Sequence, residues 1–504
     1  MSELNQRALA ALGELAEEPV EQTGPTSAFV YVDISSIDRE TKTITEAKDL
    51  TLSQAPSRAK QRLRAGDVLV SMTRPNLNAV ALVPEQLDGA IGSTGFHVLR
   101  SRWLRPDFLL RLVQSQRFVD EMSALVQGAL YPAVRPKDIA AFTFTFETPA
   151  QQTRIVAKLE ELLSDLDAGV AELKAAQKKL AHYRQSLLKA AVEGALTAAW
   201  RAKNTPSETG AQLLERILTE RRARWEAKQR AKFAEQGKTP PKDWQKKYPE
   251  PVQPDTTDLP ELPEGWVWAS VEQLASESSY GTSVKCSYES NGTPVLRIPN
   301  VSSGGLDLRD IKFSTVNLGI DRSDALDVGD VLVIRTNGSI RLVGRAAAVV
   351  TNLPQPHFFA SYLLRLRCVE TTSVHRWILA VLTAPAGRQW LEERAASSAG
   401  QHNISLSTLH TMPIPLPPLI EQSFALTEIQ DNNEAIGKQE DAISLSLKQS
   451  AAQRQNILRA AFAGELVPQD PSDEPASVLL ERIRAERAAQ AVLKKPRGRK
   501  VKSA

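Results

Sequence analysis

The chain repeats itself in order, and this internal duplication constrains its fold more than any other feature. The segment SLLKAAVEGAL at 186–196 returns as NILRAAFAGEL at 456–466, displaced by 270 residues. Gln152 and Gln422 keep that displacement, and the pentapeptides GDVLV and LLERI each occur twice. The matches follow one order in both halves. The sequence therefore predicts two copies of one module, each with a variable part followed by a helical part.

The variable parts, about 28–150 and 264–420, have the pattern of mixed α/β domains. Each GDVLV, at 66–70 and 329–333, is a short apolar run after a Gly-Asp turn, which is typical of a buried strand. The segments 106–126 and 374–396 have the periodicity of amphipathic helices. Alternation near the end of each part predicts a half-buried final strand, through Phe142, Phe144 and Phe146 and through Met412, Ile414 and Leu416.

The helical parts carry heptads. Leucine recurs every seven residues in the first copy, and isoleucine does so in the second, with Ser450 as the break. This repeat predicts two helices of about 70 Å, near 152–198 and 422–466, with one packed on the other as a coiled coil. The alternative is two amphipathic helices packed on separate domains; matched length and phase favour the coiled coil. The predicted seam consists of Leu159, Leu166, Leu173, Leu180, Leu187, Ile429, Ile436, Ile443 and Ile457.

The remaining segments complete the predicted organisation. LPEGWVWASV opens the second copy, whereas the first copy has only the polar MSELNQRALAAL. Either the opening of the first copy has diverged, or an edge element is missing. The predicted boundaries are an N-terminal extension (1–27), a first domain (28–150), a central helical spacer (151–237), a Pro-rich linker (238–263), a second domain (264–420), a C-terminal helical spacer (421–490) and a basic tail (491–504).

Composition excludes several classes of protein. Net charge is only +3, so any nucleic-acid surface must come from where the charges lie. Cys286 and Cys368 are far apart and form no CxxC, which argues against zinc and a disulfide framework and favours a reducing cytoplasm. No run approaches the roughly 18 apolar residues of a membrane helix.

Motifs for catalysis were sought and not found in the sequence. The chain has no P-loop, and its two Pro-Pro pairs do not form the Asn/Asp-Pro-Pro-aromatic loop of an amino-methyltransferase. Glu172-Leu173-Lys174 matches a nuclease Glu-x-Lys, but it lies within the leucine heptads and is interpreted as a solvated helix face. The six histidines lack metal-ligand spacing. We therefore predict no catalytic residue and no metal site.

The pattern resembles the specificity subunits of Type I restriction–modification systems. The resemblance covers nearly the whole chain and is strongest in the segments 262–274, 414–422 and 457–487, with a weaker first copy at 147–163 and 186–197. It implies an α/β fold with two target-recognition domains separated by two long antiparallel helices. It implies binding to a bipartite, asymmetric site in double-stranded DNA. It also implies assembly with two modification (methyltransferase) subunits and with restriction (motor-nuclease) subunits, which would bind S-adenosylmethionine, ATP and Mg while this chain binds no cofactor.

Candidate DNA-reading residues follow each GDVLV strand, precede the first one, or lie before the last strand of each domain. Arginine reads guanine and Asn or Gln reads adenine, whereas Lys and Arg also anchor phosphates. Each candidate could instead be an ordinary solvated surface residue. In the first copy they are Arg58, Lys60, Arg62, Arg74, Asn76, Asn78, Arg135 and Lys137. In the second copy they are Arg335, Asn337, Arg341, Gln401, His402 and Asn403.

Two other functions compete with DNA recognition by a specificity subunit. One is a coiled-coil scaffold whose two globular ends bind other proteins. The other is a single-chain restriction enzyme, which the missing catalytic motifs oppose. The two globular copies have diverged while the helical copies remain similar, and this contrast favours a reader of an asymmetric site.

Overall fold

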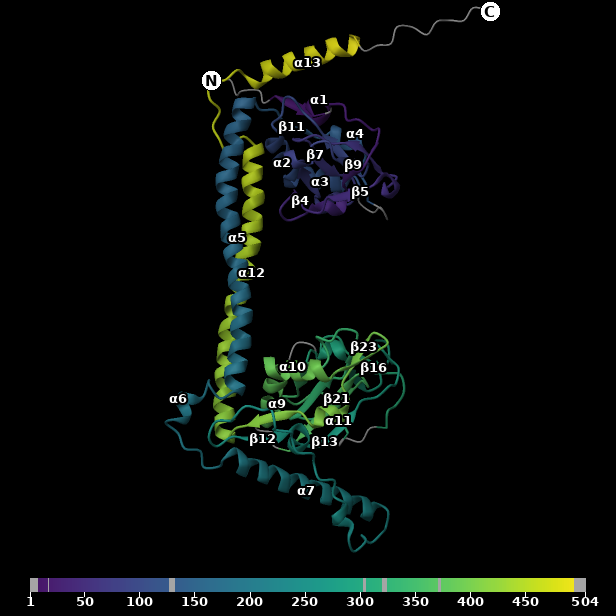
Figure 1. Cartoon of the computed structure of the whole chain (residues 1–504), viewed down its shortest axis with the longest axis vertical. Helices are drawn as coiled ribbons and strands as arrows, with labels where there is room; N and C mark the ends of the chain where they lie inside the picture. The colour runs from purple at the N-terminus through teal and green to yellow at the C-terminus, as the bar shows by residue number, and fades with distance from the viewer. Residues whose placement is uncertain are drawn as a thin grey trace, which may run out of the picture. The chain divides into compact units, whose positions relative to one another are not determined.

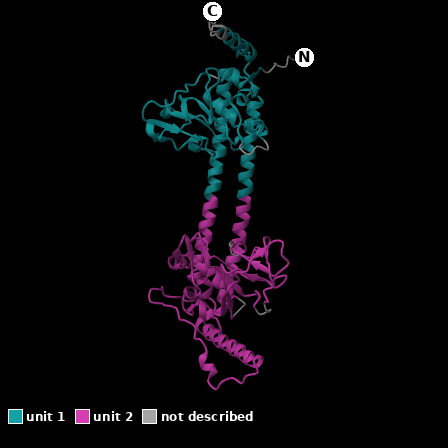
Figure 2. Ribbon diagram, turned by 90° about the vertical axis from the view of Figure 1, so that its right-hand side faces the viewer, with its two compact units in different colours: residues 1–175, 443–504 teal, residues 176–442 magenta. Residues whose placement is uncertain are grey.

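The structure, a computed structural model, describes residues 8–16, 18–126, 132–301, 305–319, 324–369 and 373–493. The basic tail predicted at 491–504 lies almost wholly outside these residues. The chain forms two compact units, residues 1–175 with 443–504 and residues 176–442 (Figure 2). Each unit contains one globular domain and one part of each of two long helices (Figure 1).

The two long helices are α5 (Pro149–Val192) and α12 (Leu419–Phe462), with 44 residues each. Their first residues differ by the same 270 positions as the sequence repeat, and each is about 66 Å long at about 1.5 Å per residue. Each helix ends shortly before a glycine with positive φ. This glycine is Gly194 (φ 76°) after α5 and Gly464 (φ 71°) after α12. Glycine adopts this left-handed conformation without a Cβ clash, so it closes both helices in the same way.

The two helices run antiparallel, as contacts within each unit show. In the first unit, Arg454 of α12 pairs with Asp167 of α5. In the second unit, the Tyr183 hydroxyl donates to Asn432 Oδ1 at 3.0 Å, and Arg184 pairs with Glu440 at 3.2 Å. A pair of helices covers only one side of each seam residue, so burial is partial along the middle. Of the predicted seam residues, Leu159, Leu187, Ile429 and Ile436 are buried, and Leu166, Leu173, Leu180, Ile443 and Ile457 are half-buried.

The first domain is a mixed α/β fold. Its strands are β1 (Leu9–Ala11), β2 (Phe29–Val32), β3 (Ile37–Asp38), β4 (Thr43–Ile44), β5 (Lys48–Leu50), β6 (Ala59–Arg62), β7 (Val68–Ser71), β8 (Val80–Leu82), β9 (Ile91–Ser93), β10 (Phe96–Leu99) and β11 (Thr143–Thr145). Its helices are α1 (Leu12–Leu15), α2 (Pro106–Gln114), α3 (Gln116–Ala124) and α4 (Pro136–Ala140). The strands pair as β5-β2-β9-β6, β10-β7-β8, β1-β11 and β3-β4. Its core joins Phe108 and Phe144 to Leu159 of α5, Leu458 of α12 and Leu480 of α13 (Ala476–Leu493).

The second domain has the same plan. Its strands are β12 (Val267–Ser270), β13 (Ala275–Tyr280), β14 (Cys286–Ser287), β15 (Pro294–Leu296), β16 (Lys312–Ser314), β17 (Asp330–Ile334), β18 (Thr336–Asn337), β19 (Ala346–Ala348), β20 (Phe358–Phe359), β21 (Leu363–Cys368), β22 (Ala396–Ser398), β23 (Gln401–Asn403) and β24 (Pro413–Leu416). Its helices are α8 (Val271–Leu274), α9 (Val374–Thr383), α10 (Pro385–Arg394) and α11 (Leu406–His410), and α6 (Ala198–Arg201) and α7 (Gly210–Glu235) lie in the same unit. The strands pair as β13-β21-β17-β19, β14-β16-β15-β20, β18-β23-β22 and β12-β24.

The two predicted domain helices are each broken in two. Ser115 separates α2 from α3 with an extended backbone (ψ 144°), and its hydroxyl accepts from the Phe118 N–H. Ala384 separates α9 from α10 because the residue before a proline avoids the helical region, and Pro385 follows it. Gly387 lets the start of α10 lie close to the end of α9, since a Cβ at position 387 would lie 1.9 Å from the Val381 carbonyl oxygen. The predicted strands are confirmed, since both GDVLV runs and both final strands are strands with buried side chains.

The opening of the first copy has diverged and is not missing. β1 pairs antiparallel with β11, as β12 pairs with β24 in the second domain. Ala10, Leu12 and Leu15 belong to the buried core of the first domain. The first element packed into this domain therefore precedes the boundary that we expected at residue 28. By these registers Leu9 takes the place of Trp268, and Ala10 takes the place of Ala269. The replacement of a tryptophan in the strand makes the similarity of the two openings hard to see in the sequence.

The Pro-rich segment 238–263 packs along α7 and α8. Tyr248 is buried, and its hydroxyl accepts from Arg221 Nη1 of α7 at 2.5 Å. The Val252 N–H donates to Glu272 of α8, and the Val252 carbonyl accepts from the Ser270 hydroxyl. The segment is thus extended but anchored. None of the helices in the described parts is both long and apolar enough to cross a membrane.

Candidate nucleic-acid interface

An arginine–aspartate pair with a buried carboxylate and a half-buried guanidinium lies at the start of the central strands in both domains. In the second domain, Arg367 of β21 donates through Nε and Nη2 to the two oxygens of Asp330, both at 2.8 Å. In the first domain, Arg100 donates to Asp67 in the same way, at 2.7 and 2.6 Å. Both aspartates also accept a backbone N–H from three residues earlier, at Asp327 and Arg64. The aspartate of GDVLV therefore joins a turn to the neighbouring strand in each copy.

This pair fixes the strands whose far ends carry the candidate DNA-reading residues. The Asp330 side chain is 1% exposed. The hydrogen bonds to Asp330 raise the pKa of the Arg367 guanidinium, although burial opposes the charge. Hydrogen bonds to Asp67 likewise raise the pKa of Arg100. Such charge-assisted, bidentate pairs hold two strands in one register.

In the second domain, the structure brings most of the predicted residues together. We call residues 335–341 with 396–403 the second loop edge. There β18 pairs with β23, which places Thr336 opposite Asn403 and Asn337 opposite His402. β22 and β23 form a hairpin whose turn has Ala399 and Gly400 at positive φ. One small three-stranded sheet thus contains Asn337, Gln401, His402 and Asn403, and Arg335 directly precedes its first strand.

The side chains on this edge differ in their exposure and in their hydrogen-bond partners. Arg341 is exposed, and no side-chain partner is recorded for it among the described residues. Asn337 Oδ1 accepts the Ser339 N–H at 2.9 Å, so half of its amide already shapes the turn. Arg335 Nε donates to Asn403 Oδ1 at 3.3 Å. Gln401 is exposed, and His402 is half-buried.

The sequence analysis missed Tyr280 and Tyr362 on the same side of this domain. Their exposed fractions are 46% and 53%, and both are among the large exposed apolar side chains. The Arg335 guanidinium lies over the Tyr280 ring, 4.6 Å from its centroid. The Arg335 N–H donates to the Tyr362 carbonyl at 2.9 Å. Tyr280 stands in the polar run ASESSY, which gives no sequence signal, because only the pairing of β13 with β21 brings it near Arg335.

The first domain has an equivalent edge, residues 72–78 with 132–135. Thr73 bridges to Ala133, as Thr336 pairs with Asn403 in the second domain. The Val134 N–H donates to the Met72 carbonyl, as the Ile404 N–H donates to the Arg335 carbonyl. Arg74 and Asn76 are exposed here, and Arg135 and Lys137 follow at the start of α4. Arg135 also pairs with Asp138 at 3.3 Å.

The structure does not gather all of the first-domain candidates. The Asn78 amide is half-buried and donates to the Val113 carbonyl at 3.0 Å, so it supports the loop. Arg58 lies near the edge, as two backbone hydrogen bonds show. The Arg58 carbonyl accepts from the Thr94 N–H, and the carbonyl of the next residue, Gly95, accepts from the Met72 N–H. Arg58, Lys60 and Arg62 alternate along β6, so Arg62 lies about 13 Å farther away at about 3.3 Å per residue. Arg62 lines a polar hollow with Glu21 and Asp88 instead.

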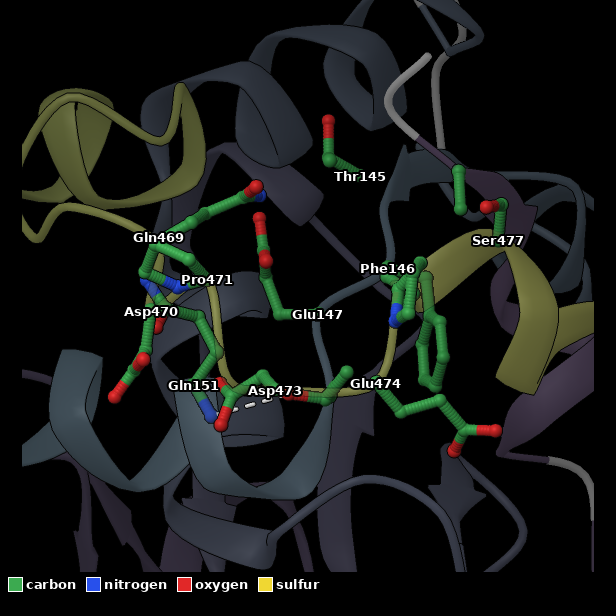
Figure 3. Close-up of a pocket in the computed structure, with 14 residues that line it drawn as sticks. Thr145, Phe146, Glu147, Gln151, Gln469, Asp470, Pro471, Asp473, Glu474 and Ser477 are labelled. Atoms are coloured by element: carbon green, nitrogen blue, oxygen red, sulfur yellow. Dashed lines mark hydrogen bonds between the residues drawn. The ribbon is translucent and has the colours of Figure 1, made fainter. Parts of the chain in front are cut away.

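The first unit also contains a cavity of about 300 Å³ at the start of α5 (Figure 3). Phe146, Gln151 and Asp473 are among its lining residues. At the displacement of 270, Gln151 corresponds to Glu421 in the second unit. Glu421 is buried and accepts hydrogen bonds from Thr197, from Arg201 and from the Trp266 indole N–H at 3.0 Å. The same network is not built around Gln151, which donates to the carbonyls of Val467 and Pro468.

In the described parts of the chain, no group of three or more His, Cys, Asp or Glu residues is placed to hold a metal ion. The exposed Arg, Asn, Gln and Tyr side chains of the edges are instead those that contact base edges and phosphates. The exposed side chains of the edges can therefore donate and accept hydrogen bonds, carry charge and stack through flat groups.

Comparisons with known proteins give one consistent result. No protein-family model matches the chain. The Type I restriction enzyme StySPI specificity subunit of Salmonella potsdam is 22% identical over 439 residues, which are 85% of this chain and 82% of that protein. The EcoKI specificity subunit of Escherichia coli K12 is 23% identical over 440 residues, with the same coverage of both proteins.

One solved structure has a similar fold. A chain solved in a study of complex assembly and conformational transition of the type I R-M system aligns with a TM-score of 0.66. The alignment covers 91% of this chain and 98% of that chain, at 24% identity. Two α/β domains linked by long helices are thus common to both proteins.

Proposed function

We propose that this chain, which is a relative of the specificity subunits of Type I restriction enzymes, recognises a bipartite and asymmetric site in double-stranded DNA. One observation carries the proposal: two domains of one plan present different side chains at equivalent edges. Arg74 and Asn76 stand on the first edge, and Arg335, Asn337 and Arg341 stand on the second. Two readers with different contacts match a target whose two halves differ.

The side chains of both edges suit base recognition. Arginine can donate two hydrogen bonds to guanine, and Asn or Gln can pair with adenine in the major groove. Arg58, Lys60, Arg135 and Lys137 would anchor phosphates near the first edge, because they carry charge without a fixed base-reading geometry. We infer that base reading is concentrated at the loop edges, with Asn78 and Arg62 in supporting roles.

The catalytic steps would belong to partners. We propose that two modification subunits and the restriction subunits assemble on this chain, bind S-adenosylmethionine, ATP and Mg, and methylate or cleave where it directs them. Both cysteines are free thiols, which suits a reducing cytoplasm.

The purified chain alone is expected to methylate and cleave no DNA. Together with a modification subunit and S-adenosylmethionine, it should support adenine methylation at one defined site. Methyl-transfer assays on genomic DNA, with the chain alone and with each subunit omitted in turn, check this. Methyl transfer by the isolated chain would contradict the proposal.

Exchange of the first domain for that of a relative is expected to change one half of the target only. Residues 28–150 would be replaced, with residues 8–16 exchanged as well because β1 pairs with β11. Methylation-aware sequencing of host DNA reads both halves at once. The reciprocal exchange of residues 264–420 is the matched control and should change the other half. A change of both halves in either chimera would show that the domains do not read independently.

A further inference from the structure

We propose that Tyr280 and Asn403 hold the Arg335 guanidinium so that its two terminal amino groups read a guanine in the half-site of the second domain. This inference rests on the proposed function and names the readers of one base. Arg335 would touch the base. Tyr280 is a positioning residue, since it would act through Arg335.

The guanidinium has two supports, on its face and on its edge. Its central carbon lies 4.6 Å from the Tyr280 ring centroid, which is within cation–π distance. Nε donates to Asn403 Oδ1 at 3.3 Å. Among the described residues, no hydrogen bond is recorded for Nη1 or Nη2. The two nitrogens that form a bidentate pair with guanine O6 and N7 are therefore the two left free.

The backbone beneath this side chain is also fixed. The Arg335 N–H donates to the Tyr362 carbonyl at 2.9 Å, and the Arg335 carbonyl accepts from the Ile404 N–H at 2.8 Å. Tyr280 is held by the pairing of β13 with β21, opposite Leu364, and its hydroxyl accepts the Leu406 N–H at 3.2 Å. Both members of the stack are thus anchored to separate strands of the domain.

Such support matters because an arginine side chain is long and rich in rotamers. A guanidinium that is already oriented loses less conformational freedom when it binds, so more of the hydrogen-bond energy appears as discrimination between bases. Tyr280 remains 46% exposed, so the stack forms at the surface where DNA would lie.

The first domain lacks this arrangement. The position equivalent to Arg335 is Met72, which makes the same backbone contact through its carbonyl. Methionine has no donor for a base edge. The supported guanidinium is therefore specific to the second half-site, which fits two edges that read different sequences.

The experiment uses the complete chain assembled with its modification subunit. Methylation would be measured on a DNA library with every base varied at each position of both half-sites. Arg335→Ala should lower the preference for guanine at one base pair by about tenfold or more. Tyr280→Leu should lower it at the same base pair by a smaller factor, and the double variant should lose no more than Arg335→Ala alone. Tyr280→Phe keeps the ring and should keep most of the preference.

A matched control lies in the same domain. Tyr288 has a cation–π contact with Arg297 at 5.8 Å and is 59% exposed, and no contact between it and the second loop edge is recorded among the described residues. Tyr288→Leu should leave the base preference unchanged. If Tyr280→Leu lowers the thermal stability of the domain, Asn403→Ala gives a second probe and must weaken the same preference.

Three results would overturn the inference. The first is an unchanged base preference in Tyr280→Leu, and the second is additive losses in the double variant. The third is a loss in Arg335→Ala that is equal for all sequences. Each would refute the proposal that Arg335 reads a base with support from Tyr280. The last result would make Arg335 a phosphate contact and leave the proposed function intact. Absence of any sequence preference in the wild-type complex would instead refute the proposed function.

Discussion

Replacement of Asp330 by alanine is expected to lower the free energy of unfolding of the second domain by about 3 kcal/mol, because it leaves the half-buried Arg367 guanidinium without its hydrogen-bonded carboxylate. Asp330 also accepts the Asp327 N–H, so the turn before β17 loses its anchor as well. At about 2–4 °C per kcal/mol for a domain of this size, the thermal midpoint should fall by roughly 10 °C.

The equivalent pair in the first domain allows a matched comparison. Asp67 makes the same three contacts in the first domain, so Asp67→Ala should weaken that domain alone. Hydrogen exchange can separate the two: Asp330→Ala should lose protection in β17 and β21, and Asp67→Ala should lose it in β7 and β10. Asp307→Ala removes an ion pair with the exposed Arg309 and is expected to change little. Normal protection of β17 and β21 in Asp330→Ala would contradict the stabilising role of the pair.

Lengthening both long helices by one heptad is expected to shift the preferred spacing between half-sites by about three base pairs. Seven residues would be inserted after Ala176 and after Ser446, which keeps all seam residues in phase. The insertion adds about 10 Å of helix, and DNA rises about 3.4 Å per base pair. The added base pairs also rotate the outer half-site by roughly a third of a turn on a 10–10.5 base-pair repeat, so activity should fall.

An insertion in one helix alone should be far more damaging. The helices could then no longer satisfy both the Arg454–Asp167 contact and the Arg184–Glu440 contact, because one helix would be longer between them. Methylation of a library with varied spacers measures the preferred spacing of each variant. An unchanged preference in a folded double-insertion variant would refute the idea that the helices set the distance.

The features predicted from the sequence are those encoded locally or by repetition. The displacement of 270 residues predicted two modules, and the leucine heptads predicted two paired helices of nearly the observed length. GDVLV predicted a buried strand because three apolar residues follow a turn. Ser115 was not recognised as a break, since serine occurs both within helices and at their starts.

The candidate site was harder to predict, because it depends on contacts between distant strands. Arg335 and Asn403 were each singled out, but only the pairing of β18 with β23 shows that they touch. Tyr280 lies 55 positions before Arg335, in a run of polar residues. Asn78 shows the opposite failure, because a loop asparagine looks the same in sequence whether its amide faces solvent or the Val113 carbonyl.

The first unit is completed by residues from the far end of the chain, and this has a consequence during synthesis. Ile155, Leu159 and Leu163 of α5 share a core with Leu458 and Ala461 of α12. A ribosome that adds about 5–20 residues per second takes roughly 15 to 60 s to cover the stretch between Leu163 and Leu458. The nascent chain carries an uncovered apolar stripe for that time, and the α12 end of a neighbouring copy offers the same complementary surface. The rate of translation thus helps to decide whether a chain closes on itself or joins its neighbour.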